Sequence, residues 1–159
     1  MEVNVRRATE DDYEALCELW AQADGYHAAA LPQVFRRPEG YARARAFVTA
    51  AVADQETGFF VAELSGQVIG LVRVTIRRAP DVPCFVPRRY AFIEEVVVRE
   101  GFRGRGFGRL LLEHAHRWAR QHGVDQIELS VYEFNTGAIR LYQQLGYATL
   151  SRRMVCSLA

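Results

Sequence analysis

Along the 159-residue chain, segments whose hydrophobic positions recur every two residues, as in strands, alternate with segments where they recur about every 3.6 residues, as in helices. Residues 3–7 alternate and predict a short strand. Apolar residues then recur three or four positions apart and predict a helix from Thr9, with Asp12 completing a capping box, to about Ala23. An irregular stretch over 25–38 follows. The further predicted elements are a helix over 39–53, a β-hairpin of 59–64 and 68–77, a strand over 89–98, a helix over 107–122, a strand over 126–132, a helix over 135–145 and a final strand over 147–158.

This β-α-α-β-β-β-α-β-α-β order predicts a mixed α/β fold. No repeat or linker divides the chain, so we expect one domain over residues 1–159. A hydrophobic share of 50% and a net charge of +1 are typical of a soluble protein and favour neither a nucleic acid nor a membrane as partner. The sequence shows no signal-peptide layout and no apolar run near the roughly 20 residues of a membrane span, so we expect a cytoplasmic protein.

The basic residues exclude several kinds of chemistry. All 20 are arginines, which rules out the lysine of a P-loop, of a Schiff base and of a protein kinase. The three cysteines share no motif spacing and are expected to be free thiols. The four histidines form no metal-ligand spacing with cysteines or carboxylates, so we expect no metal.

A segment rich in glycine and arginine separates the predicted strand 89–98 from the helix after it. It reads Arg103-Gly104-Arg105-Gly106-Phe107-Gly108 and is followed by Arg109. The backbone N–H groups at a helix N-terminus bind phosphate oxygens, and glycines let the backbone curl so that several N–H groups point at one anion. Arginine adds positive charge. The segment predicts a pyrophosphate site, although its spacing differs from the dinucleotide-binding motif. An ordinary glycine-rich turn with solvated arginines is the other interpretation.

Two motifs in the second half resemble those of the GNAT superfamily of N-acetyltransferases. The family pattern Arg/Gln-x-x-Gly-x-Gly/Ala is met by Arg103, Gly106 and Gly108, after the strand 91–98. The second motif spans 133–147 and contains Asn135 and Tyr142. The resemblance covers about the last seventy residues. It implies a GNAT-type mixed central sheet with helices on both faces, and acetyl-CoA as co-substrate without a metal.

The resemblance also implies how acetyl-CoA is held. The strand 94–98 is expected to splay from its neighbour, so that backbone groups of Val96 and Val98 pair with the pantetheine arm. The N–H of Val96 is our candidate donor to the acetyl carbonyl oxygen. The expected acetyl-CoA-binding residues are Val96, Val97, Val98, Arg103, Gly104, Arg105, Gly106, Phe107, Gly108, Arg109, Asn135 and Ala138.

Two residues are candidates for catalysis. Glu94 matches a glutamate that serves as general base in polyamine-acetylating relatives, and Tyr142 matches a tyrosine that protonates the leaving thiolate. Because side chains alternate along a strand, Glu94 and Glu95 are predicted to face opposite sides, with Glu94 on the side of Val96 and Val98. The other interpretations are a rim carboxylate paired with an arginine such as Arg89, and an aromatic residue packed on the core.

The acceptor is predicted less closely than the reaction. In this family the acceptor site is built near the first two helices and the central strands, which makes Tyr26, His27, Phe35 and Glu95 candidates. Six arginines in these segments either favour an acceptor with a carboxylate or phosphate or form a solvated rim. We expect transfer to a primary amine of a small molecule or to a peptide or protein amino group. A non-catalytic acyl-CoA sensor is the alternative. A homodimer is expected because many relatives pair, often through terminal strands.

Overall fold

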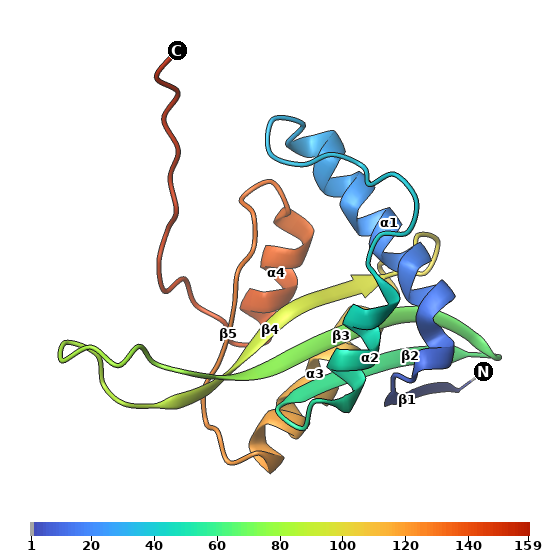
Figure 1. Cartoon of the computed structure of the whole chain (residues 1–159), viewed down its shortest axis with the longest axis horizontal. Helices are drawn as coiled ribbons and strands as arrows, with labels where there is room; N and C mark the ends of the chain where they lie inside the picture. The colour runs from blue at the N-terminus through green and yellow to red at the C-terminus, as the bar shows by residue number, and fades with distance from the viewer. Residues whose placement is uncertain (1) are drawn as a thin grey trace.

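The computed structural model describes residues 2–159 and contains one five-stranded sheet in the order β1-β2-β3-β4-β5 (Figure 1). Its elements are β1 (Val3–Arg7), a 3-10 turn (Glu10–Asp12), α1 (Tyr13–Ala30), α2 (Arg45–Ala53), β2 (Thr57–Leu64), β3 (Gln67–Arg78), β4 (Arg89–Val98), α3 (Phe107–Gln121), β5 (Ile127–Leu129) and α4 (Thr136–Gln144). Strands β1 to β4 are antiparallel neighbours, and β5 runs parallel to β4. The mixed α/β fold expected from the sequence is confirmed.

Two hydrophobic clusters hold helices against the two faces of the sheet. In β3, Leu71 belongs to the cluster that contains Trp20 of α1 and Val48 of α2, whereas Val72 belongs to the cluster that contains Leu111 of α3. This alternation follows from the two-residue period of a strand that is buried on both faces. The sheet is therefore the middle of three layers, with α1 and α2 on one side and α3 and α4 on the other (Figure 1).

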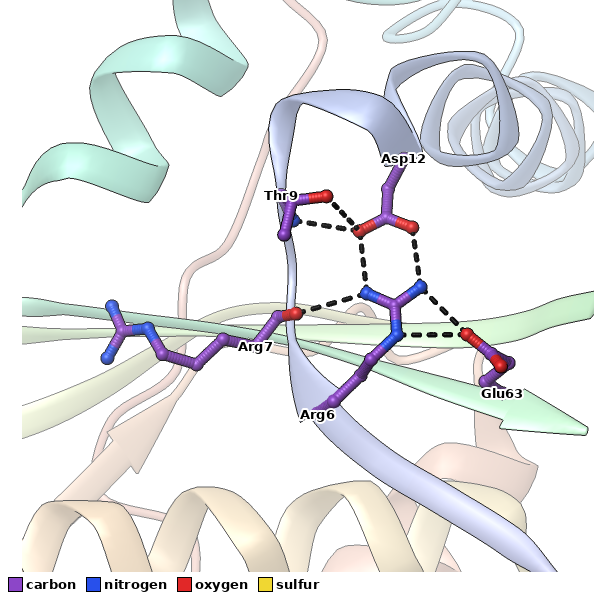
Figure 2. A network of polar contacts seen from close by, with 5 residues as sticks. All are labelled: Arg6, Arg7, Thr9, Asp12 and Glu63. Atoms are coloured by element: carbon purple, nitrogen blue, oxygen red, sulfur yellow. Dashed lines mark hydrogen bonds and ion pairs between the residues drawn. The ribbon is translucent and has the colours of Figure 1, made fainter. Parts of the chain in front are cut away.

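The start of α1 is fixed by a polar network that joins it to β1 and β2 (Figure 2). The Thr9 backbone N–H donates to Asp12 Oδ2 at 2.8 Å, as the capping box predicts. Arg6 donates to both carboxylate oxygens of Asp12 and, through Nε, to Glu63 Oε2 at 2.9 Å. Burial by itself would raise the pKa of the Asp12 carboxyl, but the hydrogen bonds from Arg6 and Thr9 outweigh it and hold that pKa below its usual value.

Two helix boundaries differ from the prediction. Helix α1 continues past Gly25 to Ala30, because the alanines at its end favour helix and Pro32 is the residue that stops it. Helix α2 begins at Arg45 rather than near residue 39. Gly40, with φ +75°, is left-handed and cannot belong to a right-handed helix, and Ala44, the N-cap, is extended, so α2 starts only at Arg45.

The last two predicted strands also differ. β5 has three residues, whereas the pattern predicted seven over 126–132. The predicted final strand over 147–158 does not pair, and the prediction was wrong in that respect: residues 148–159 are exposed and run away from the body as an extended arm (Figure 1). Among residues 2–159, no helix is long and apolar enough to cross a membrane.

Candidate functional site

A gap opens between β4 and β5 halfway along β4. The two strands pair from Ala91 with Ile127 to Ile93 with Leu129, and no strand among residues 2–159 pairs with this side of β4 beyond that point. The five residues from Glu94 to Val98 therefore line one wall of the gap. The expectation that this strand splays from its neighbour agrees with the observed register.

A β-bulge lies at the point where the gap begins. Arg73 of β3 pairs with Glu95 while Val74 pairs with Ile93, so Glu94 is an extra residue on the bulged strand. A bulge shifts the alternation of backbone and side chains by one position. The bulge therefore changes the directions of the two carboxylates and of the free backbone groups of β4.

The bulge brings both carboxylates to the same face of the sheet. Thr75 Oγ1 donates to Glu94 Oε1 at 2.6 Å, and Arg77 Nη2 donates to the same oxygen at 2.7 Å. Arg73 Nε donates to Glu95 Oε1 at 3.1 Å. These three partners occupy alternate positions of β3 and so share one face. The prediction that Glu94 and Glu95 point to opposite faces was wrong, because it assumed an unbroken strand.

This shared face is the one covered by α1 and α2. The Arg73 guanidinium lies 5.0 Å from the ring centre of Phe47 in α2. Val96 and Val98 instead pack against the cluster on the α3 side, so Glu94 does not share their side as predicted. The arginine that pairs with Glu94 is Arg77, whereas the sequence suggested one such as Arg89.

The free backbone groups of β4 nevertheless face the gap at the expected positions. Ahead of the bulge, the Ala91 N–H donates across to Gln126 O at 2.9 Å, toward β5. Beyond it, the Arg99 N–H donates to Ile69 O at 2.8 Å, toward β3. Alternation from Arg99 puts the backbone groups of Val98 and Val96 on the gap side. Arg103 Nε donates to Val98 O at 3.0 Å from that side.

The glycine-arginine loop leads from the end of β4 to the N-terminus of α3. Gly104 (φ +72°) and Gly106 (φ +86°) are left-handed, and Gly106 is the N-cap of α3 with no side chain to satisfy the first N–H groups of the helix. The side chains of Arg103, Arg105 and Arg109 carry three positive charges around this helix end. The loop therefore offers the N–H groups, the helix dipole and the charges that a pyrophosphate requires.

Gly108 has a packing role within the same loop motif. A Cβ there would lie 3.3 Å from Leu141 Cδ2 of α4 and 3.7 Å from Val98 Cγ2 of β4. The absence of a side chain lets the first turn of α3 approach both elements. The third glycine thus allows the close approach of α3 to α4 at Leu141.

Helix α4 carries the residues of the second motif. Asn135 is its N-cap, and its side-chain oxygen accepts from the Ala138 N–H at 3.3 Å, so these two predicted acetyl-CoA-binding residues contact each other. The Tyr142 side chain is partly buried against the α3-side cluster. Burial raises the pKa of the Tyr142 phenol above its ordinary value near 10, which keeps the phenol protonated at neutral pH.

Five aromatic rings meet where α1 ends and α4 begins. His27 lies 5.2 Å from Phe35 and 5.4 Å from Phe134, measured between ring centres. Tyr26 lies 5.5 Å from Phe134, and Phe35 lies 5.2 Å from Tyr132. Three of the predicted acceptor residues, Tyr26, His27 and Phe35, are therefore brought together. Tyr132 and Phe134 were not singled out from the sequence, although Phe134 directly precedes Asn135 in the second motif and Tyr132 lies one residue ahead of that motif.

Glu95, the fourth predicted acceptor residue, lies outside this aromatic cluster. It belongs to the row of ion pairs under α1 and α2, where Arg43 Nη1 also donates to Asp24 Oδ2 at 2.9 Å. The carboxylates of Asp24 and Glu95 both raise the pKa of Arg43. Within residues 2–159, no three histidine, cysteine or carboxylate side chains gather closely enough to hold a metal ion.

Comparison with known proteins gives this arrangement a family. The model of the family described as Acetyltransferase (GNAT) family matches residues 13–147, which include the gap, the loop and α4. The chain belongs to the GNAT acetyltransferase family. The resemblance stated from its two motifs is thereby confirmed.

The GNAT chain has curated relatives and solved neighbours of the same kind. The uncharacterized N-acetyltransferase MJ1207 of Methanocaldococcus jannaschii is 31% identical over 147 residues, which are 90% of this chain and 59% of that protein. The L-ornithine N5-acetyltransferase NATA1 of Arabidopsis thaliana is 34% identical over 79 residues, 50% of this chain and 35% of that protein. The chain thus spans less than two thirds of the length of either relative.

Two solved structures show the same fold. A mutant of the BH1408 protein from Bacillus halodurans superposes with a TM-score of 0.92 at 28% identity, covering 98% of this chain and 99% of that one. AAC(6')-Iy, solved with the bisubstrate analog CoA-S-monomethyl-acetylneamine, superposes with a TM-score of 0.75 at 19% identity, covering 100% of this chain and 99% of that one. At that identity the second likeness concerns the fold alone.

Proposed function

We propose that this GNAT protein transfers the acetyl group of acetyl-CoA to a primary amine, of a small molecule or of a peptide or protein. The observation that carries the proposal is the gap between β4 and β5, which begins beside Glu94 and has the glycine-arginine loop at its end. Relatives named as N-acetyltransferases support the reaction type.

The residues of the gap and loop fit the two polar parts of the co-substrate. The N-terminus of α3, with Arg103, Arg105 and Arg109, would hold the pyrophosphate. The gap-side backbone groups of Val96 and Val98 would pair with the pantetheine amides as an added strand does. Arg103 Nε already donates to the Val98 carbonyl, so this oxygen would accept from both Arg103 and a pantetheine amide through its two lone pairs.

Acetyl-CoA supplies the activated thioester, and the chain supplies proton transfer and positioning. The amine nitrogen forms a C–N bond to the acetyl carbon as the C–S bond breaks, giving an amide and CoA thiolate. Glu94 takes the proton that the amine loses, directly or through water, and Tyr142 gives a proton to the thiolate. The Val96 N–H donates to the carbonyl oxygen, where negative charge develops.

Glu94 retains one oxygen for this role. Its Oε1 accepts from Thr75 and Arg77, which orients the carboxylate, while Oε2 accepts no hydrogen bond among residues 2–159. Glu94 is on the α1 and α2 face, so we propose that the amine approaches from that side. The Glu94 side chain is 19% exposed, which leaves it within reach of an acceptor.

The charges of this face bear on the acceptor. Three ion pairs line it, Glu94 with Arg77, Glu95 with Arg73 and Asp24 with Arg43, so each of these three carboxylates already has a cation. A polyamine would be attracted by unpaired carboxylates, which these pairs do not provide. We propose that an amine which also carries a carboxylate is preferred, because a paired arginine keeps N–H donors that a second carboxylate can use while the amine nitrogen approaches Glu94. The name of the ornithine N5-acetyltransferase relative supports this class.

The test is a calorimetric titration with acetyl-CoA, followed by a free-thiol assay over matched amines: lysine and ornithine, their amides, and the diamines that lack the carboxylate. Binding with thiol release that is fastest for the amino acids is the expected result. Binding without release for any amine would favour the acyl-CoA sensor. Absence of binding would show that the loop does not hold the pyrophosphate, and the proposed function would be lost.

A further inference from the structure

Gly25 is a buried glycine in the interior of α1, a helix that is otherwise rich in alanine. Its φ is not among the positive values found at other glycines, so the backbone conformation does not require glycine here. Alanine would favour the helix more. The missing side chain instead makes room for Arg37: a Cβ on Gly25 would lie 3.2 Å from Arg37 Cζ, 3.3 Å from Nη2 and 3.4 Å from Nη1.

The three distances also show how the Arg37 guanidinium is oriented. Because they are nearly equal, the flat face of the group, and not its edge, lies against Gly25. The N–H donors of a guanidinium lie in its plane, so this packing leaves them open. None of the hydrogen bonds and ion pairs formed among residues 2–159 involves Arg37, which is largely exposed. Arg43, Arg73 and Arg77, by contrast, are each bonded to a carboxylate.

The contact with Gly25 lies between the row of ion pairs and the end of the gap. Asp24, the residue before Gly25, pairs with Arg43 of that row at 2.9 Å. Tyr26, the residue after it, has its ring centre 5.8 Å from the Cζ of Arg103 in the glycine-arginine loop. Successive residues of a helix point about 100° apart, so Gly25 faces a direction between those of its two neighbours. The guanidinium packed on it therefore lies between the carboxylate face and the opening for acetyl-CoA.

We propose that Arg37, held flat on Gly25, is the subsite that binds the carboxylate of the acceptor. The inference rests on the proposed transfer to an amine that also carries a carboxylate. A planar guanidinium binds a carboxylate through two parallel N–H···O bonds, and Arg37 has all its donors available for them. The packing on Gly25 fixes the plane of the group before the acceptor arrives, so less freedom is lost on binding.

The test compares kcat/KM for lysine with kcat/KM for lysinamide, which lacks the carboxylate. Arg37→Gln should lower the ratio of the two by about tenfold or more, because hydrogen bonds between charged groups are lost. The loss should appear in KM for lysine, with kcat and acetyl-CoA affinity little changed. Gly25→Ala keeps every charge but displaces the guanidinium, so it should lower the same ratio. Its Tm should not fall, because alanine favours the helix and Arg37 has no other bond to lose.

Arg36→Gln is the matched control. Arg36 is also exposed and also has no hydrogen bond or ion pair among residues 2–159, so the variant removes the same charge one residue away. Its ratio should equal that of the wild type. Equal falls in Arg36→Gln and Arg37→Gln would show an effect of net charge and overturn the proposal. An unchanged ratio in Arg37→Gln would also overturn it, while leaving acetyl transfer intact. An unchanged ratio in Gly25→Ala would show that the glycine does not build the subsite.

A binding measurement separates this inference from the proposed function. If the wild type released thiol with no amine, the proposed function would fail. Calorimetric titration of the CoA-bound protein with lysine and with lysinamide would then still decide the subsite. Tighter binding of lysine that is lost in Arg37→Gln and kept in Arg36→Gln would support it. Equal binding of lysine and lysinamide by the wild type would overturn it.

Discussion

Glu94 and Glu95 are adjacent carboxylates on the same face, each bonded to an arginine of β3, and they differ in their relation to the gap. Glu94 is the bulged residue where β4 and β5 part, whereas Glu95 is paired in register with Arg73. If Glu94 is the base, Glu94→Gln removes the proton acceptor but keeps the shape. We expect kcat for acetyl transfer to fall about 10²- to 10⁴-fold with acetyl-CoA affinity unchanged.

Glu95→Gln is the matched control for that variant. It makes the same chemical change one residue away and also breaks one arginine pair, so it reproduces the loss of charge without the loss of the base. A fall in kcat below about tenfold is expected for it. Equal losses in the two variants, measured by thiol release at saturating acetyl-CoA, would mean that the charge of this face rather than the position of Glu94 matters.

The phenol of Tyr142 is partly buried, and burial makes the loss of its proton harder. Burial raises the pKa of the phenol above its ordinary value near 10, so the acid is present at neutral and mildly alkaline pH. Tyr142→Phe should lower kcat while leaving acetyl-CoA affinity nearly intact. Tyr147→Phe is the control, since Tyr147 lies 5.7 Å from Tyr142 between ring centres but its hydroxyl bonds to His116 Nε2.

The pH dependence of the wild-type rate adds a separate check on Tyr142. Because the phenol keeps its proton up to high pH, Tyr142 should cause no decline in kcat between pH 7 and pH 9. A decline in that range which disappears in Tyr142→Phe would contradict this assignment. A decline that persists in the variant would come from another group.

The two ends of α3 allow the pyrophosphate site to be tested as a feature of one helix. Gly106→Glu places a negative side chain on a left-handed residue at the N-terminus, where phosphate would bind, and should raise the acetyl-CoA Kd by about tenfold or more. Gly123→Glu makes the same change at the opposite end, where φ is +73° and no atom lies within 4 Å of the added Cβ. Both variants carry similar strain.

Calorimetric titration separates the two glycine variants. Weakened binding in Gly106→Glu alone would support the loop as the anion site. Equal weakening in both would point to general destabilisation of α3, and unchanged binding in Gly106→Glu would show that the pyrophosphate lies elsewhere.

Periodicity and turn residues predicted most elements because each is decided locally. The strand 89–98 was predicted with the bounds that the structure shows, and the hairpin that precedes it within two residues. The features that the local pattern did not predict depend on contacts with other strands. The bulge at Glu94 depends on how β3 and β4 align, and a single strand carries no mark of it. The arm has the alternation of a strand, but alternation does not tell whether a partner exists in the same chain.

The sequence predicted the separate segments of the candidate site better than the contacts between them. The glycine-arginine loop and the N-cap Asn135 follow from short-range rules, and the structure places both at helix starts. Thr75 and Arg73 were missed because they contact the carboxylates from the neighbouring strand. The bulge also changes which face of the sheet the carboxylates share. The sequence of one strand does not predict which side chains meet across strands, because the register between the strands decides those contacts.

At the start of the chain, the network of Arg6, Asp12 and Glu63 joins β1, the 3-10 turn that precedes α1, and β2 (Figure 2). Asp12 is nearly buried, with 7% of its side chain exposed, whereas Arg6 is 33% exposed, so solvent screens their ion pair only in part. Asp12→Asn keeps the shape but removes the charge that faces the Arg6 guanidinium. We expect the free energy of unfolding at pH 7 to fall by about 2 kcal/mol.

The sign of the pH dependence follows from the depressed pKa of Asp12 in the folded protein. Its contribution to stability is complete above the unfolded value of 3.8 and is lost as pH falls through the lower folded value. The Tm difference between wild type and Asp12→Asn should therefore be large at pH 7 and pH 5 and shrink below about pH 4. Asp11→Asn, an exposed neighbour, makes the same charge change outside the network and should shift Tm little at any pH. A Tm difference for Asp12→Asn that is the same from pH 7 down to pH 3 would mean that the ionised carboxylate does not hold these elements together.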